Sequence, residues 1–235
     1  MEHLVLLPGL LCDERVWRDQ IAALGDVVPC SVANWGTLDS IVGMAEHVLA
    51  TAPPEFALAG HSMGGRVAFQ VIRRAPERVT RLALLNTGAD TRQSGAAGKQ
   101  EERNRMALVE LARTQGMRAM AMKWLPPMMH PRRMEDTALV EEIVQMIERK
   151  TPEMFFAQQR ALLGRPDANP VLSTIHCPTM LLSGREDTWS PPSRHEEMAA
   201  KIPGSRVVIV ADSGHMAPME QPAAVSQALR EWLSS

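Results

Sequence analysis

Uninterrupted apolar runs alternate with amphipathic segments along the first third of the chain. Because these runs stay apolar rather than alternating with polar residues, we expect strands buried on both faces, as in a parallel sheet covered by helices. The segments between them carry apolar residues three and four positions apart, which predicts helices. The predicted strands are His3–Leu7, Val27–Val32, Phe56–Ala59 and Val79–Leu85, and the predicted helices are Arg15–Leu24, a segment from a cap at Asp39 or Ser40 to Ala50, and the segment that follows Ser62 to Arg74.

The pattern changes between Gly88 and Pro170, where no segment predicts a strand. We expect residues 88–170 to form a helical cap, or lid, over the strand ends, inserted into a core made of residues 1–87 and 171–235. The fold class is therefore α/β, with a mostly parallel sheet of about six strands, helices on both faces and a helical cap. The cap helices are expected at Glu101–Gln115, Met117–Trp124, Thr137–Lys150 and Pro152–Leu163, and the core then continues with strands at Pro178–Ser183 and Arg206–Val210 and helices at Ser193–Ile202 and Ala223–Leu233.

The central motif is Gly60-His61-Ser62-Met63-Gly64, between an apolar run and an amphipathic helix. A serine on so tight a strand-to-helix turn is held in a strained conformation at its tip, and flanking glycines avoid a collision with neighbouring chain. The new helix leaves backbone N–H groups free, so the Met63 amide would face an oxyanion formed beside Ser62. We therefore expect Ser62 to be a nucleophile, and the alternative is a plain strand–turn–helix connection. The glycine spacing fits neither a phosphate loop nor a dinucleotide fingerprint.

A serine hydroxyl needs a general base within hydrogen-bond reach and a group that orients this base. His215 is the candidate among the seven histidines because its loop follows the predicted strand Arg206–Val210. That places it at the carboxyl edge of the sheet, where ligands bind in such folds. His61 flanks the serine but projects from the turn itself, so we do not expect it to reach back.

Asp187 is the candidate acid, because it follows the predicted strand Pro178–Ser183 at the same edge. Asp90, which follows the preceding strand, is the main rival. Glu186 and Asp212 are weaker candidates, the latter because it is too close to the histidine in sequence. The alternative role of Asp187 is a surface carboxylate that caps the next helix.

Composition narrows the function further. The 235 residues suit one domain with an insertion, and a net charge of −2 gives no basic field for nucleic acid. No apolar run approaches the roughly 20 residues of a membrane span. The N-terminus shows no signal peptide, and three scattered cysteines fit reduced thiols, so we expect a cytoplasmic protein without a metal site. The expected partner is a small-molecule substrate, and a homodimer is compatible with the sequence.

Four motifs in order resemble the α/β-hydrolase superfamily, in particular its esterase and C–C hydrolase branch with a helical cap. The order Ser62…Asp187…His215 is that of these enzymes. The resemblance implies that the Leu10 amide is the second oxyanion donor. Two departures are Pro8, where a histidine is common, and the lack of an opening antiparallel hairpin. The motifs are Leu6-Leu7-Pro8-Gly9-Leu10, Gly60-His61-Ser62-Met63-Gly64-Gly65, Gly184-Arg185-Glu186-Asp187 and Gly214-His215-Met216-Ala217-Pro218-Met219-Glu220-Gln221-Pro222.

The resemblance implies a serine hydrolase that cleaves a carboxylic ester through an acyl-enzyme, without metal or organic cofactor. Apolar residues suggest a small-to-medium apolar substrate. We expect Arg66 and Arg185 to be surface or structural residues, and a carboxylate-binding role stays open. The alternatives are a C–C hydrolase of a diketone, a haloperoxidase or perhydrolase, and a low-turnover binding protein. The expected substrate-binding residues are Leu11, Trp124, Met128 and Trp189.

Overall fold

The computed structural model describes residues 3–235. Met1 and Glu2, part of the N-terminal segment considered above, lie outside the described residues. Within residues 3–235, no helix is both long and apolar enough to cross a lipid bilayer.

Six strands form one sheet in the order β2-β1-β3-β4-β5-β6, and every neighbouring pair is parallel. This confirms the predicted α/β fold class with about six strands. The expected absence of an opening hairpin agrees with the sheet formed by residues 3–235, in which all pairings are parallel. The strands are β1 (Leu4–Leu7), β2 (Cys30–Val32), β3 (Phe56–His61), β4 (Val79–Leu85), β5 (Thr179–Gly184) and β6 (Arg206–Val210).

Burial explains why most strand sequences are continuously apolar. Every residue of β1, β3 and β5 is buried, whereas the edge strands β2 and β6 are only partly covered. A central parallel strand has helices on both faces, so a polar side chain on either face would lose its hydration and destabilise the fold.

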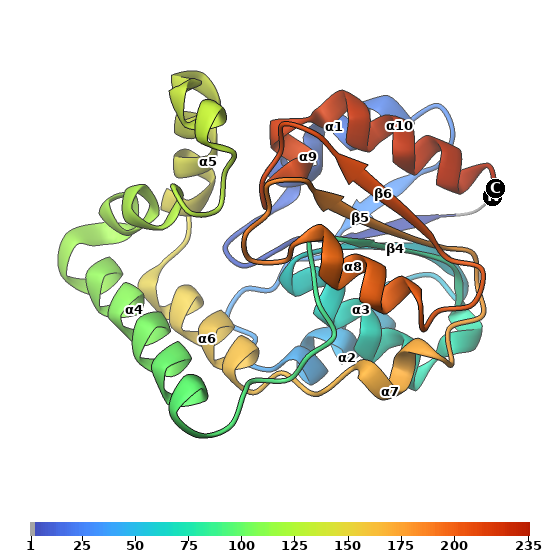
Figure 1. Ribbon diagram of the computed structural model, residues 1–235, viewed down its shortest axis with the longest axis horizontal. Coiled ribbons are helices and arrows are strands. Elements are labelled where there is room, and N and C mark those ends of the chain that lie inside the picture. The colour runs from blue at the N-terminus through green and yellow to red at the C-terminus, as the bar shows by residue number, and fades with distance from the viewer. Residues whose placement is uncertain (1–2) are drawn as a thin grey trace.

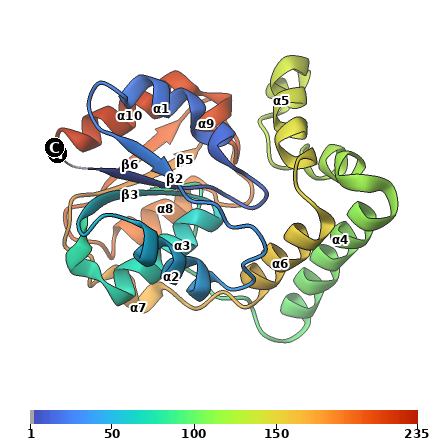
Figure 2. The same cartoon turned by 180° about the vertical axis from the view of Figure 1, so that it is seen from behind.

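Helices cover both faces of the sheet (Figures 1 and 2). Helices α1, α9 and α10 lie on one face, and α2, α3, α7 and α8 lie on the other. Ser40 caps α2, since its Oγ accepts a hydrogen bond from the amide of Gly43. Their bounds are α1 (Arg18–Leu24), α2 (Ile41–Thr51), α3 (Met63–Arg74), α7 (Asn169–Leu172), α8 (Pro192–Ala199), α9 (Ala217–Glu220) and α10 (Pro222–Leu233), with 3₁₀ turns at Glu14–Trp17 and Pro76–Arg78.

Two predicted elements differ from the structure near the N-terminus. The helix predicted at Arg15–Leu24 begins as the 3₁₀ turn Glu14–Trp17. The strand predicted at Val27–Val32 pairs with β1 only over its last three residues. The reason is that the amides of Val27 and Val28 both donate to the carbonyl oxygen of Leu24, which keeps them in the turn after α1.

The segment between β4 and α7 is helical and lies beyond the carboxyl edge of the sheet (Figure 1). Its elements are α4 (Gly95–Trp124), a 3₁₀ turn (Pro131–Glu135), α5 (Thr137–Glu148) and α6 (Pro152–Leu163). Gly116 interrupts α4 with φ 88°, which a glycine adopts without a Cβ penalty. The two helices predicted on either side of it therefore form one kinked helix, which begins six residues earlier than predicted. We call α4, α5 and α6 with their connections the cap, and its boundaries at 88 and 170 stay a prediction.

Candidate active site

Ser62 lies on a sharp turn between β3 and α3, with φ 54° and ψ −115°. This region is unfavourable for a residue with a Cβ, so the surrounding structure must enforce it. A Cβ on Gly60 would lie 2.6 Å from the carbonyl oxygen of Gly64, and one on Gly64 would collide with the carbonyl oxygen of Leu7. The two glycines thus allow backbone to pack against backbone, and the serine is left at the tip of the turn.

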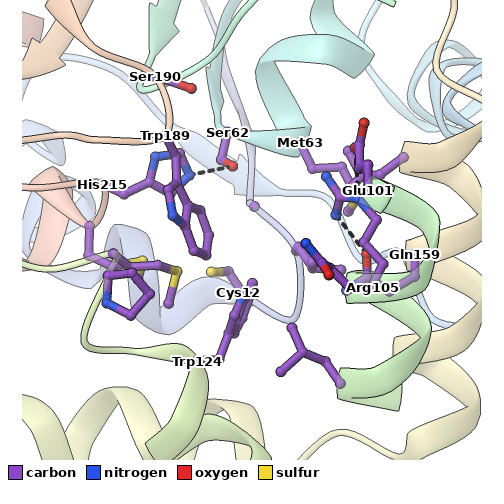
Figure 3. A pocket seen from close by; sticks show the side chains of 18 of the residues that line it. Cys12, Ser62, Met63, Glu101, Arg105, Trp124, Gln159, Trp189, Ser190 and His215 are labelled. Carbon is purple, nitrogen blue, oxygen red and sulfur yellow. Dashed lines mark hydrogen bonds and ion pairs between the residues drawn. The ribbon is translucent and has the colours of Figure 1, made fainter. Parts of the chain in front are cut away.

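A continuous hydrogen-bond chain joins the three residues predicted as nucleophile, base and acid. Ser62 Oγ lies 2.8 Å from His215 Nε2, and His215 Nδ1 lies 2.8 Å from Asp187 Oδ2 (Figure 3 shows the first contact). An ionised carboxylate only accepts hydrogen bonds, so Nδ1 carries the ring proton and Nε2 is free to accept the serine proton. His215 and Asp187 are both buried. The arrangement can perform nucleophilic acyl transfer.

Asp187 is held in place on both carboxylate oxygens. Oδ1 accepts from the amides of Trp189 and Ser190, each at 2.9 Å, and Oδ2 also accepts from Asn86 Nδ2 at 2.9 Å. Burial alone would raise the pKa of Asp187, but the charge and hydrogen bond of His215 and the bonds from Asn86 and Ser190 outweigh it and hold this pKa well below its ordinary value. The carboxylate is therefore ionised beside the imidazole.

The rival acids lie elsewhere. Asp90 is exposed and accepts a hydrogen bond from Asn169 Nδ2 at 3.0 Å. Glu186 accepts from the amide of Ser213, and Asp212 is largely exposed. No hydrogen bond or ion pair to His215 involves any of the three, so the geometry favours Asp187 as the acid.

Glu220 organises the loop that carries His215. Its Oε2 accepts from the amides of Gly214 and Met216, each at 3.0 Å, and its Oε1 accepts from the amide of His130 at 2.7 Å. Burial raises the pKa of Glu220 despite these three bonds. Because His130 belongs to the cap, this one carboxylate fixes both the histidine loop and the adjoining cap segment.

His61 does not reach back to the hydroxyl of Ser62, as expected, and instead contacts the main chain of His215. Its Nε2 donates to the carbonyl oxygen of His215 at 2.8 Å, and its ring lies 5.6 Å from the ring of His215. Burial and the neighbouring His215 lower the pKa of His61 to about 4, so the ring is neutral at pH 7. It therefore positions the loop and is not bonded to Ser62.

The amides of Leu10 and Met63 have no hydrogen-bond acceptor among residues 3–235, and both residues line the cavity that contains Ser62. Free N–H groups beside a nucleophile can stabilise an oxyanion. The adjacent Leu11 does not line this cavity. It is fully buried with φ 60°, and its amide donates to Gln158 Oε1, so the expected substrate contact of Leu11 is wrong.

The cavity has a volume of about 970 Å³ and lies between the core and the cap. Trp124, Met128 and Trp189, predicted as substrate-binding residues, all line it. The ring of Trp189 lies 5.2 Å from that of His215 and 5.6 Å from that of Trp124. Figure 3 shows these aromatic rings on one side of Ser62, and Glu101, Arg105 and Gln159 on the other. Among residues 3–235, no cluster of histidine, cysteine or acidic side chains is arranged to hold a metal ion.

The comparisons with known proteins agree with this fold. A family model described as alpha/beta hydrolase fold matches residues 31–222. The chain belongs to the α/β-hydrolase fold family. A pimeloyl-[acyl-carrier protein] methyl ester esterase of Nitrosomonas europaea is 24% identical over 90% of this hydrolase and 88% of its own length. An (E)-2-((N-methylformamido)methylene)succinate hydrolase of Acinetobacter baylyi is 24% identical, and the match covers 100% of this chain and 91% of the relative. A malate-bound structure of a thermophilic esterase from Thermogutta terrifontis superposes with a TM-score of 0.86 and is 31% identical. The match covers 100% of this chain and 90% of the esterase chain.

Sequence reasoning missed three polar residues that support the site of this hydrolase. Asn86 directly follows β4 with φ 49°, and its side chain also donates to the carbonyl oxygen of Gly214. An asparagine at a strand end is a usable signal, since asparagine tolerates positive φ. Glu220, an acid within an apolar segment, was a second signal. The third, His195, accepts from the amide of Thr87, whose hydroxyl donates to the carbonyl oxygen of Ser62.

The buried histidines make stability depend on pH. Burial is the main cause that lowers the pKa of both His61 and His195 to about 4, whereas a histidine in the unfolded chain has a pKa of about 6.5. Between these values the unfolded chain binds more protons, so the free energy of unfolding falls as the pH drops from about 6.5 to about 4. His195→Gln keeps an acceptor for Thr87 but removes one of the two groups. We expect its free energy of unfolding, measured with urea at about pH 7, 6 and 5, to fall less steeply than that of the wild type. Parallel curves would show that His195 is not buried as a neutral ring.

Proposed function

We propose that this hydrolase cleaves a carboxylic ester of a small-to-medium substrate with an apolar part, by way of an acyl-enzyme. The observation that carries the proposal is the chain of two 2.8 Å contacts from Ser62 through His215 to Asp187, which opens into the cavity. Ser62 Oγ attacks the ester carbonyl as His215 Nε2 takes the serine proton. Asp187 orients the ring and stabilises its charged form.

The tetrahedral oxyanion is bound by the amides of Leu10 and Met63. Loss of one such donor costs about 3–4 kcal/mol of transition-state stabilisation in comparable enzymes. His215 then gives its proton to the departing alcohol, so the C–O bond breaks and Ser62 is acylated. A water molecule, deprotonated by the same ring, attacks the acyl group, and the acid leaves with Ser62 regenerated.

An ester is favoured as the substrate because two of the similar proteins described above are esterases by name. The apolar wall of Trp124, Met128 and Trp189 supports an apolar part in the substrate. A C–C hydrolase or a binding protein with little turnover would use the same geometry. We expect these to be separated by turnover of simple esters.

Ser62→Ala tests the nucleophile. We expect the rate of hydrolysis of p-nitrophenyl esters from acetate to dodecanoate to fall on the order of a million-fold, because the variant lacks the hydroxyl that forms the acyl-enzyme. Release of p-nitrophenol is followed by absorbance. Ser94→Ala is the matched control, since Ser94 is exposed and its side chain makes no cap bond. Equal activity in Ser62→Ala and the wild type would refute the mechanism, and an inactive wild type would refute the ester assignment.

The acid is tested by Asp187→Asn beside Asp90→Asn. The amide at position 187 cannot accept the proton of Nδ1 in the same way and favours the wrong tautomer of His215, so we expect kcat to fall by about 10⁴-fold. Asp90→Asn is expected to stay within about threefold of the wild type, because Asp90 does not contact the imidazole. The reverse order of the two losses would assign the acid to Asp90.

A further inference from the structure

One end of the cavity is built from four arginines. Arg66 of α3, Arg105 of α4, Arg165 and Arg194 of α8 all line the cavity that contains Ser62. A recess of about 260 Å³ shares Arg66, Arg165 and Arg194 with it. Arg66 was expected to be a surface or structural residue, whereas Arg185, the other arginine considered from the sequence, is indeed exposed.

Two of these cations lack a carboxylate partner. Glu101 pairs with Arg105 at 2.9 Å and with Arg165 at 2.7 Å. Within residues 3–235, no carboxylate oxygen lies within 4.0 Å of a guanidinium nitrogen of Arg66 or Arg194.

Among the described residues, both unpaired guanidinium groups form hydrogen bonds with main-chain carbonyls only. Arg66 Nη1 donates to the carbonyl oxygen of Asp90 at 2.7 Å, and Arg194 Nη1 donates to that of Trp189 at 3.1 Å. A guanidinium has five N–H donors, so most of the donors of each group are left for a ligand. The carboxylate of Asp90 also lines the recess, and its charge acts to raise the pKa of Arg66, but it is bonded to Asn169 and forms no ion pair with Arg66.

The local field also favours an anion. Burial, together with the like charges of Arg165, Arg194 and Arg105, lowers the pKa of Arg66 to about 9. Burial raises the pKa of Glu101, but the bonds and charges of Arg165 and Arg105 outweigh it and lower this pKa to about 2, so Glu101 stays ionised and already shared between two arginines. A partly desolvated cation without a counter-ion raises the free energy of the folded protein. A carboxylate that accepts hydrogen bonds from this cation lowers that free energy again.

The position of the arginines indicates which part of a substrate carries the charge. The leaving alcohol must lie near His215, which protonates it. Figure 3 shows Glu101 and Arg105 on the opposite side of Ser62, beside Met63. Arg66 belongs to the first turn of α3, four residues after the nucleophile. The two residues are about one helical turn apart and line the same cavity, so an acyl chain bonded to Ser62 can extend toward the arginines.

We propose that Arg66 and Arg194 bind a carboxylate at the far end of the acyl part of the substrate, which makes the substrate a half ester of a short dicarboxylic acid. The proposal rests on the acyl-enzyme function above. The apolar rings on the His215 side then face the alcohol part and the scissile bond.

Turnover of matched esters tests the proposal. The charged probes are the monomethyl esters of glutaric, adipic and suberic acid, and the neutral probes are methyl pentanoate, hexanoate and octanoate. Acid release is followed by pH-stat. We expect the wild type to prefer the best charged ester by at least about tenfold in kcat/KM. Arg66→Gln and Arg194→Gln should each lower kcat/KM for that ester by about tenfold to a hundredfold, mainly through KM, and change the neutral esters by less than about threefold.

Arg74→Gln is the matched control, because Arg74 lies on the same helix, is exposed and, within residues 3–235, forms hydrogen bonds with Gln70 only. We expect it to behave as the wild type with both ester series. No preference for a charged ester, or equal losses on charged and neutral esters in Arg66→Gln, would overturn the carboxylate subsite and leave the esterase proposal standing.

A binding measurement separates failure of the subsite from failure of the proposed chemistry. Monomethyl adipate is titrated calorimetrically into Ser62→Ala and into Ser62→Ala with Arg66→Gln. We expect the second substitution to raise the Kd by at least about tenfold. If that shift is found while the wild type turns over no ester, the subsite stands and the esterase proposal falls. If the two proteins bind the probe equally or not at all, the subsite is refuted.

Discussion

The close backbone approach at the turn of Ser62 is the constraint on which the rest of the site depends. Gly64 passes so near the carbonyl oxygen of Leu7 that no side chain fits, and this contact places the start of α3 directly beside the end of β1. The neighbouring Gly9 also lies beside Ser62, since a Cβ on Gly9 would be 3.3 Å from the Cβ of Ser62, although the two residues are 53 positions apart in sequence. The unfavourable φ of Ser62 is the local cost of this arrangement, and the fully buried strands β1 and β3 hold it in place.

Around this turn, buried polar contacts hold the loops that carry the other two residues of the hydrogen-bond chain. Asn86 links Asp187 to the carbonyl of Gly214, Glu220 ties the histidine loop to the cap, and His61 binds the carbonyl of His215. Each of these groups is almost completely buried, and its bonds are therefore costly to lose. These contacts hold the loops that carry Asp187 and His215 in the positions that give the distances of the hydrogen-bond chain.

The sequence allowed the parallel sheet, the two helical segments on either side of Gly116 and the roles of Ser62, Asp187 and His215 to be predicted, because each depends on local pattern or on the edge at which parallel strands end. That the two segments form one kinked helix was not predicted. Contacts between distant segments could not be predicted in this way. Leu10 and Leu11 are both apolar, yet a positive φ at Leu11 turns it into the core and leaves Leu10 at the cavity. The roles of Glu220 and of the cavity arginines likewise depend on contacts that form only when α3, the cap and the histidine loop pack together.

The measurement that tests the central claim most directly is the covalent labelling of Ser62 by a p-nitrophenyl alkylphosphonate, followed by intact mass and peptide mass spectrometry. The phosphonate phosphorus accepts the serine oxygen and loses p-nitrophenolate, leaving a stable tetrahedral adduct. The account predicts one adduct per chain, on the peptide that contains Ser62, and loss of labelling in His215→Ala. An adduct on another residue, or the absence of an adduct while esters are still hydrolysed, would contradict it.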